Sequence, residues 1–154
     1  MELRRLQIDD APAAAALAGQ LGYPTDAAQM EQRLALVAGS ETDGLVGVFD
    51  GGGMLGWIHV QERRTLERDP YAEICALVGD EAARGSGIGA ALVEEAERWA
   101  AARGLGTIHV RSNVLRERAH RFYERRGYVR EKTAHAFTKA VRPTRAGPGR
   151  GARR

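Results

Sequence analysis

One segment of the chain spaces glycines and an arginine in a way that could bind a phosphate group. Arg84 is followed by Gly85, Gly87 and Gly89. Glycine has no Cβ, so a tight turn built from it can expose backbone N–H groups to an anion. Where such a turn opens a helix, the helix N-terminus adds about half a positive charge. The spacing therefore predicts a site for a phosphate or a pyrophosphate.

Several kinds of phosphate site use glycine turns, and the neighbouring residues discriminate between them. A nucleotide-binding P-loop requires Lys and then Ser or Thr after its last glycine, whereas Ala90 and Ala91 stand here. The dinucleotide-binding pattern is met loosely by Gly85, Gly87 and Ala90. Against it, residues 80–84 separate the glycines from the preceding strand, and no acidic residue follows at a spacing of about 20. A purely structural glycine turn stays open as an alternative.

The elements that would position this turn follow from apolar periodicity and from turn residues. We expect helices over residues 9–22, 26–39, 87–103 and 116–126. We expect strands over residues 3–8, 45–49, 54–60, 71–79, 107–110, 128–131 and 134–141, with a hairpin turn at 50–53 and a charged connector at 62–70. This order predicts a mixed α/β domain with a parallel strand–helix–strand crossover in its second half.

The glycine turn and its surroundings resemble the acetyl-CoA signature of the GNAT acetyltransferase superfamily. The matching residues are Arg84-x-x-Gly87-x-Gly89, Ile74 and Leu77 in the strand before it, Ser112-Asn113 after the next strand, and the run from Ala119 to Tyr128. The resemblance implies a central mixed, mostly antiparallel sheet of six to seven strands with a splayed parallel pair, flanked by about four helices. It also implies acetyl-CoA as the acyl donor and requires no metal.

The resemblance assigns cofactor contacts residue by residue. The pyrophosphate would lie on the loop formed by Arg84, Gly85, Ser86, Gly87, Ile88 and Gly89. The pantetheine arm would pair with the backbone of Leu77, Val78 and Gly79, which requires the strand to splay from its neighbour. Many family members carry an apolar residue where Gly79 stands, so this glycine is a departure that either deepens a bulge or loosens the strand end.

Catalytic roles also follow from the resemblance. A strand N–H at Val78 or Gly79 would stabilise the developing oxyanion. Tyr123 would protonate the departing thiolate, or else it only packs beside its aromatic neighbour in the sequence. Glu73 would take the proton from the acceptor amine, directly or through water, or else it pairs with an arginine across the sheet. Asn113 would bind the pantetheine, or else it caps the helix that follows.

The remaining chemically capable residues give weaker signals. The four histidines, His59, His109, His120 and His135, lack metal-ligand spacing, although His59 near Trp57 could line an acceptor pocket. Cys75 is the only cysteine, and within an apolar strand we expect it to be a small buried hydrophobe rather than a nucleophile. Arg116 begins a basic helix and could reach the additional phosphate on the cofactor ribose.

The composition of the chain excludes several classes of protein. A chain of 154 residues with 44% hydrophobic content predicts one globular domain, here residues 1–141, rather than a disordered chain. Residues 142–154 hold five arginines and no acidic residue, so we expect a disordered basic tail. The first 141 residues hold 18 basic and 20 acidic side chains. With no apolar run of about 20 residues, no signal sequence and a single cysteine, we expect a cytoplasmic protein.

The sequence thus favours an N-acetyltransferase that moves an acetyl group from acetyl-CoA to an amine by direct attack in a ternary complex. Two other classes stay open. A non-catalytic acyl-CoA sensor would bind the cofactor without turnover, and association with nucleic acid, which the acidic body makes unfavourable, would rely on the basic helix and the tail. The acceptor, a small-molecule or protein amine, cannot be read from the sequence. A homodimer is expected from the resemblance alone.

Overall fold

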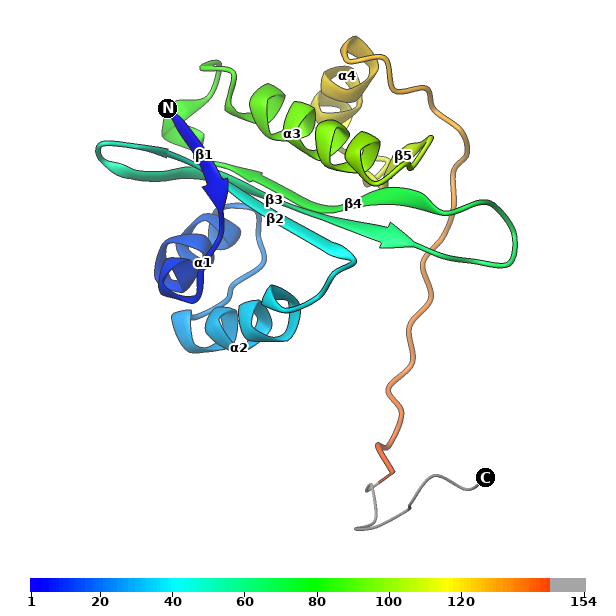
Figure 1. The fold of residues 1–154 in the computed structure, drawn as a ribbon, viewed down its shortest axis with the longest axis horizontal. Helices are drawn as coiled ribbons and strands as arrows, with labels where there is room; N and C mark the ends of the chain where they lie inside the picture. The colour runs from blue at the N-terminus through cyan, green and yellow to red at the C-terminus, as the bar shows by residue number, and fades with distance from the viewer. Residues whose placement is uncertain (145–154) are drawn as a thin grey trace. The chain divides into compact units, whose positions relative to one another are not determined.

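The computed structural model describes residues 1–144, which form two compact units, residues 1–111 and the segment from residue 112 onward. The predicted basic tail therefore lies outside the described residues from position 145. Within the described chain the first unit holds a sheet in the order β1-β2-β3-β4-β5 (Figure 1). The strands are β1 Glu2–Arg5, β2 Asp43–Asp50, β3 Gly53–Arg63, β4 Tyr71–Gly79 and β5 Ile108–Val110. The first four pair antiparallel, and β5 runs parallel to β4.

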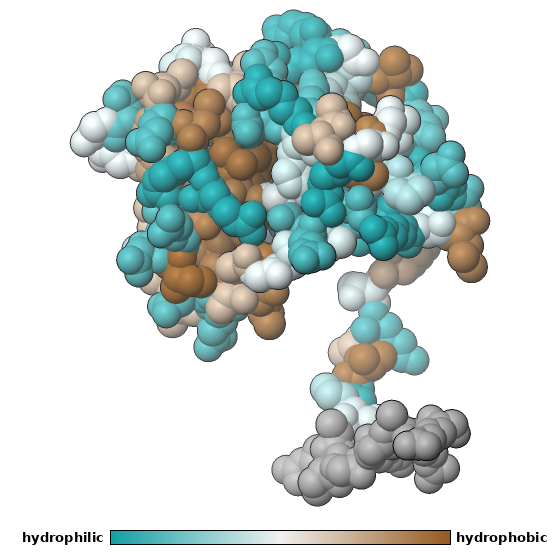
Figure 2. Space-filling view, in the orientation of Figure 1, coloured by the Kyte–Doolittle hydropathy of each residue, from teal (hydrophilic) through white to brown (hydrophobic). Residues whose placement is uncertain are grey.

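Three helices cover the two faces of this sheet. α1 (Ala11–Gln20) and α2 (Ala27–Ala38) lie on one face, and α3 (Ile88–Ala102) lies on the other (Figure 1). Asp26 caps α2 by accepting the Gln29 N–H at 2.7 Å, while the Gln29 side chain accepts the Asp26 N–H. Figure 2 shows hydrophobic side chains gathered over the region of β1, α1 and α2. The parallel crossover predicted from the sequence is the β4–α3–β5 connection.

The core divides between the two faces of the sheet. On the side of α1 and α2, Leu17, Met30, Leu34 and Leu45 belong to one buried cluster. On the side of α3, the close approach of the helix requires a glycine in β3. A Cβ at Gly56 would lie 2.7 Å from the Val78 carbonyl oxygen and 2.9 Å from Ile88 Cγ2. The core therefore holds the start of α3 directly against the β3–β4 pair.

A β-bulge interrupts β4 at its centre. Val60 lies opposite Ile74 and His59 lies opposite Ala76, which leaves Cys75 as an extra residue without a partner in β3. The bulge turns this residue outward, so Cys75 is exposed and the expectation that it is buried was wrong. The strand itself spans the predicted residues 71–79.

The segment from residue 112 holds the helix α4, Glu117–Arg125, which ends before Gly127 at a φ of +87°. The two further strands predicted over residues 128–131 and 134–141 are not formed, because residues 128–144 contain neither helix nor strand. An extended segment needs a neighbouring strand to pair its N–H and C=O groups. The apolar side chains of this stretch are also left in solvent, with Phe137 95% and Val129 87% exposed. The described fold is thus a mixed α/β fold with four α-helices and five strands.

Candidate active site

The glycine loop leaves β4 and enters α3 through two left-handed residues. Asp80 accepts the Ala82 N–H at 3.1 Å and so caps a short 3-10 turn over Glu81–Ala83. Gly85 and Gly87 then have φ values of +82° and +81°, a region that side chains other than glycine rarely adopt. The backbone of the loop therefore requires glycine at these two positions, which are the glycines singled out in the sequence.

A residue at the end of α1 fixes the loop from the side. The Gln20 side-chain oxygen accepts the Glu81 N–H at 2.9 Å, and its amide nitrogen donates to Asp80 at 3.4 Å. Sequence reasoning did not find Gln20, because 60 positions separate it from Asp80 and no local pattern marks it. The contact ties the start of the loop to the helical layer on the other side of the sheet.

Backbone N–H groups gather where the loop becomes a helix. Within residues 1–144, the amides of Gly85, Gly87, Ile88 and Gly89 donate to no protein group. The Ser86 amide instead donates to the Ala83 carbonyl at 3.2 Å, and the Ser86 hydroxyl donates to the same oxygen. Open amides at a helix N-terminus attract an anion.

The space in front of these amides is open. A Cβ built on Gly85 or Gly87 would meet no atom within 4 Å, so their positive φ requires glycine but nothing crowds them. Arg84 lies at the same rim, with 59% of its side chain exposed and a 3.8 Å ion pair to Glu81. A surface ion pair of this kind contributes little stability, so the guanidinium can turn toward a bound phosphate.

The strand that leads into the loop has an open edge. β4 pairs with β5 only from Ala72 to Ile74, opposite Ile108 to Val110. Beyond Ile74, no strand among the described residues pairs with β4 on that side. The parallel pairing therefore ends with β5 at Val110, and the second half of β4 has no strand partner on that side among the described residues.

The hydrogen-bond pattern shows which of these groups are available. The Asp80 N–H donates to the Leu55 carbonyl at 2.8 Å, so residue 80 faces β3. Because residues alternate along a strand, Val78 also faces β3, whereas Leu77 and Gly79 direct their N–H and C=O groups to the open edge. The sequence predicted that residues 77–79 would all offer backbone groups, but the geometry leaves that role to Leu77 and Gly79.

Glu73 lies in β4 just before the bulge, with 17% of its side chain exposed. Its two carboxylate oxygens face two guanidinium groups, Arg63 Nε at 3.7 Å and Arg111 Nε at 3.6 Å. The alternative in which an arginine pairs with it across the sheet is therefore the one observed. The pairing of β3 with β4 brings Arg63 onto the same face of the sheet as Glu73.

Glu73 belongs to a continuous row of polar side chains that crosses the sheet. Gln61 donates to Asp43 at 3.1 Å and accepts from Arg63 at 3.0 Å, and Arg63 contacts Glu73. His59 Nε2 lies 2.6 Å from Asp43 Oδ1 at the other end. We call these residues the polar row: Asp43, His59, Gln61, Arg63, Glu73 and Arg111. Sequence reasoning found Glu73 and left His59 open, but it missed the row, which depends on strand register.

The thiol beside this row is inactive as a nucleophile. Although the residue is exposed, neighbouring atoms partly desolvate the Cys75 sulfur and raise its pKa to about 11. The negative charges of Glu73 and Asp43 add to this effect, and the positive charge of Arg63 opposes it. The sulfur also contacts the Glu73 carbonyl oxygen at 3.6 Å. At neutral pH the thiol therefore stays protonated, in agreement with the expectation that it is not a nucleophile.

The segment from residue 112 carries the other two predicted residues. Tyr123 packs edge-on against Phe122 and Tyr128, with ring centroids 5.1 and 5.5 Å away. Burial raises the pKa of its phenol, and the positive charge of Arg116 opposes this shift. Asn113 accepts the Leu115 N–H through its side-chain oxygen at 2.9 Å, so it forms the turn before α4.

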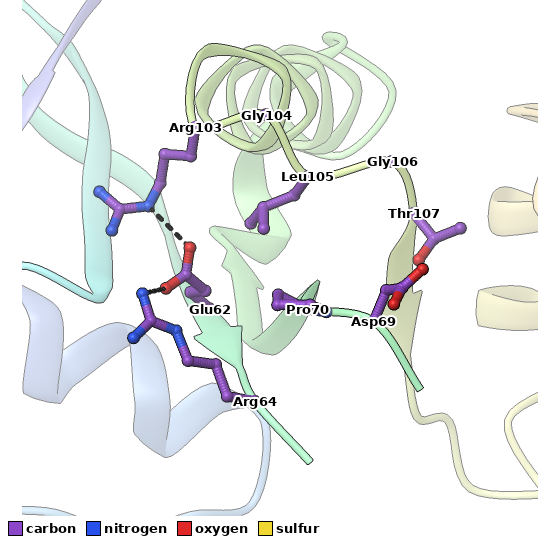
Figure 3. Close-up of a pocket in the computed structure, with 9 residues that line it drawn as sticks. All are labelled: Glu62, Arg64, Asp69, Pro70, Arg103, Gly104, Leu105, Gly106 and Thr107. Carbon is purple, nitrogen blue, oxygen red and sulfur yellow. Dashed lines mark ion pairs between the residues drawn. The ribbon is translucent and has the colours of Figure 1, made fainter. Parts of the chain in front are cut away.

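A pocket of about 450 Å³ lies at the opposite end of β4 from the glycine loop. In Figure 3, the carboxylate of Glu62 lies between Arg64 and Arg103, with N–O distances of 2.8 and 3.6 Å, and Asp69 lies beside Thr107 across the pocket. Its charged groups already pair with one another. It lies too far along the strand to share a ligand with the loop, so we do not assign it to the site.

Two further observations concern the described residues alone. Across residues 1–144, no three His, Cys, Asp or Glu side chains come together as metal ligands would. In the same part of the chain, no helix combines the length and the apolar character that crossing a bilayer requires.

Comparison with known proteins agrees with this arrangement. The family model of the Acetyltransferase (GNAT) family matches residues 4–128. The chain therefore belongs to the GNAT acetyltransferase family, whose members use acetyl-CoA as the acyl donor. Among curated proteins, no relative matches the sequence.

Solved structures share the fold at low sequence identity. An aminoglycoside antibiotic 6'-N-acetyltransferase from Acinetobacter haemolyticus superposes with a TM-score of 0.80 at 14% identity, covering 92% of this chain and 99% of its own. Glucosamine-6-phosphate N-acetyltransferase from Arabidopsis thaliana gives 0.76 at 19% identity, covering 89% and 97%. A Trypanosoma brucei acetyltransferase gives 0.76 at 19%, covering 90% and 99%.

Proposed function

We propose that this protein is an N-acetyltransferase that transfers the acetyl group of acetyl-CoA directly to an amine. The observation that carries the proposal is a line of unpaired backbone N–H groups. It begins at Leu77 and Gly79 on the open edge of β4 and continues through the glycine loop to the first turn of α3. An extended ligand with amides at one end and a diphosphate at the other satisfies this line.

Each part of the donor then has a partner. The pyrophosphate accepts from the amides of Gly85, Gly87, Ile88 and Gly89, and Arg84 adds a full positive charge. The pantetheine amides pair with the open edge of β4 as an additional strand would. Asn113 keeps its side-chain nitrogen for the same arm, because only its oxygen is engaged in the turn. When bound, acetyl-CoA supplies the activated thioester.

The edge amides differ in their distance from the loop. Gly79 lies beside the loop, so its amide meets the pantetheine. Leu77 lies two residues further along β4, about 6.6 Å away. We therefore assign the Leu77 N–H to the thioester carbonyl, where it stabilises the negative charge that grows on the oxygen during attack. The bulge at Cys75 opens the strand next to this position.

Two side chains move protons in this proposal. Tyr123 donates its phenolic proton to the departing sulfur. Burial raises the pKa of the phenol, so the proton is present at neutral pH but is held more tightly than in an exposed tyrosine. The second is the base for the amine, a role that Glu73 could fill only if Arg63 or Arg111 moved away from its carboxylate, since each oxygen faces a guanidinium.

Two measurements test the proposed function. Calorimetry with acetyl-CoA reports cofactor binding, and release of free thiol reports transfer to amines. A suitable panel comprises kanamycin, glucosamine 6-phosphate, spermidine and a peptide with a free N-terminus, the first two being aminoglycoside and amino-sugar acceptors suggested by the proteins of similar fold. Binding without thiol release for any amine would favour the acyl-CoA sensor, and absence of binding would refute both.

Tyr123→Phe tests the proposed acid. The substitution removes the proton but keeps the ring and its contacts with Phe122 and Tyr128. We expect turnover to fall about 100-fold while the affinity for acetyl-CoA changes little, as is typical when one proton donor is lost. Tyr23→Phe, at a side chain that is 70% exposed in the other unit, is the matched control. Unchanged turnover in Y123F would remove Tyr123 from the mechanism.

A further inference from the structure

We propose that His59, supported by Asp43, is the group that takes the proton from the acceptor amine. This inference rests on the proposed acetyltransferase function and deepens it. It starts from the polar row, which places an imidazole on the same face of the sheet as Glu73. Nothing in the sequence pairs His59 with Asp43, because 16 positions separate them.

The carboxylate behind His59 is buried and ionised. Asp43 is only 6% exposed. Burial alone would raise its pKa, but hydrogen bonds with Ser40, His59 and Gln61 and the charge of His59 outweigh burial, so the pKa lies below its ordinary value. A buried carboxylate at 2.6 Å fixes the orientation of the imidazole.

The imidazole keeps one nitrogen free for chemistry. Nε2 is engaged with Asp43, which leaves Nδ1 as the nitrogen that accepts a proton. Among residues 1–144, no group forms a hydrogen bond with Nδ1. The side chain is 22% exposed, so solvent and ligands reach it. Histidine is the side chain that ordinarily changes charge between pH 5 and 8, which suits a base at neutral pH.

The position of His59 along the sheet fits this role. It lies opposite Ala76, which is adjacent to Leu77, the residue whose amide we assign to the thioester carbonyl. It comes two residues after Trp57, whose indole N–H donates to the Ala14 carbonyl of α1 at 3.2 Å. His59 therefore lies on the face of α1, beside the bulge and close to the edge of β4.

The charged surroundings distinguish His59 from Glu73. Glu73 faces Arg63 and Arg111, which favour its ionised form but also occupy its oxygens. On the far side of Asp43, a cavity of about 560 Å³ is lined by Arg5, Glu41, Trp99 and Arg103 among others. Positive and negative groups are therefore mixed around the row, and the group in direct contact with His59 is the Asp43 carboxylate.

The proton and electron pairs balance in the proposed step. The acceptor ammonium gives a proton to Nδ1 of His59, directly or through one water, and keeps the bonding pair on nitrogen. That nitrogen bonds to the thioester carbonyl carbon, and the carbon–sulfur bond breaks with its pair on sulfur. The sulfur takes the Tyr123 proton. The nitrogen now bonded to the acetyl carbon loses its second proton to water, and Tyr123 regains a proton from that water. The imidazolium releases the first proton to solvent.

The pH dependence of kcat/KM for the amine tests this assignment in the full chain, at saturating acetyl-CoA and with the first amine of the panel that is turned over. In the wild type we expect kcat/KM to level off above about pH 7, where histidines are neutral. In His59→Gln we expect a loss of about 100-fold at pH 7. The loss should become smaller at higher pH, because kcat/KM of the variant continues to rise about tenfold per pH unit until the pH reaches the pKa of the free amine. Asp43→Asn should lower kcat/KM less than His59→Gln does, because the imidazole stays but loses the carboxylate that orients it.

Controls separate this role from a structural one. His135→Gln, at an exposed histidine outside the row, should reproduce the wild-type profile. His59→Ala should regain turnover when imidazole is added, a rescue that a purely structural role would not give. In Glu73→Gln, kcat/KM should still level off near neutral pH, whatever the absolute turnover of this variant.

The outcomes are distinguishable. Three results would show that His59 is not the proton acceptor while the acetyltransferase function still stands. They are a kcat/KM that still levels off near neutral pH in His59→Gln, a kcat/KM that no longer does so in Glu73→Gln, and a lack of rescue by imidazole. If the wild type binds acetyl-CoA but acetylates no amine, or binds no acetyl-CoA, the proposed function fails and this inference falls with it.

Discussion

Cys75 is the residue whose titration the fold changes most clearly. Its thiol lies on the bulge of β4, next to the edge that we assign to pantetheine. Desolvation and the charges of Glu73 and Asp43 raise its pKa from 9.0 to about 11. The thiolate fraction at pH 8 is therefore about 100-fold lower than that of an unperturbed thiol, since each pKa unit is a factor of ten.

Alkylation by iodoacetamide measures this shift, and the single cysteine makes the reaction specific. Because the pKa is raised, reactivity should keep rising about tenfold per pH unit from pH 8 to 10. Glutathione, measured in parallel, should level off near its own lower pKa. A plateau for Cys75 near pH 9 would mean that burial and the two carboxylates do not act on the thiol as described.

The sequence alone identified many of the candidate site residues, but it did not show which groups those residues contact. The positive φ of Gly85 and Gly87 explains why the glycine spacing could be read from the sequence, because only a local turn is involved. The engagement of Glu73 by Arg63 and Arg111 could not be read. Those partners come from other strands, and the register that aligns them is set by packing rather than by neighbours in the sequence.

At the scale of elements, the turn into α3 should depend on one backbone conformation. Gly87→Ala places a Cβ at a φ of +81°, which costs about 1–2 kcal/mol for an alanine. We expect denaturant unfolding to show this loss and calorimetry to show weaker binding of acetyl-CoA, because the loop must shift its amides to relieve the strain.

Gly39→Ala is the matched control for this substitution. Gly39 ends α2 at a φ of −93°, and a Cβ there would meet no atom within 4 Å. Stability and acetyl-CoA binding should change little in this variant. Equal stability and equal binding in the Gly87 and Gly39 variants would show that the left-handed turn is not needed for the site.

Helices and strands were predictable to different degrees. The four helices and the strands over residues 45–49, 54–60 and 71–79 form at the predicted places, and all of them except α4 bury side chains against their neighbours. The strands predicted at 128–131 and 134–141 are not formed. Periodicity reports only that a strand would have an apolar face, whereas a strand also needs a partner strand that pairs with its N–H and C=O groups.

At the scale of the whole molecule, charge is unevenly distributed along the chain. The formal net charge is +3, yet the first 141 residues hold 18 basic and 20 acidic groups, and the remaining 13 hold five arginines. The high content of arginine near the C-terminus therefore says nothing about the site. Within the first unit, positive groups serve the loop and the polar row, where Arg84, Arg63 and Arg111 each face a carboxylate.

The central claim is that the open amides of the β4 edge and the glycine loop bind the acyl carrier. Amide NMR of the full chain during titration with coenzyme A tests it most directly. We predict saturable shifts of the Gly79, Gly85, Gly87 and Gly89 amides, with the control amide of Gly39 unmoved. Absence of saturable shifts, or shifts confined to the pocket of Figure 3 around residues 104–107, would contradict the account.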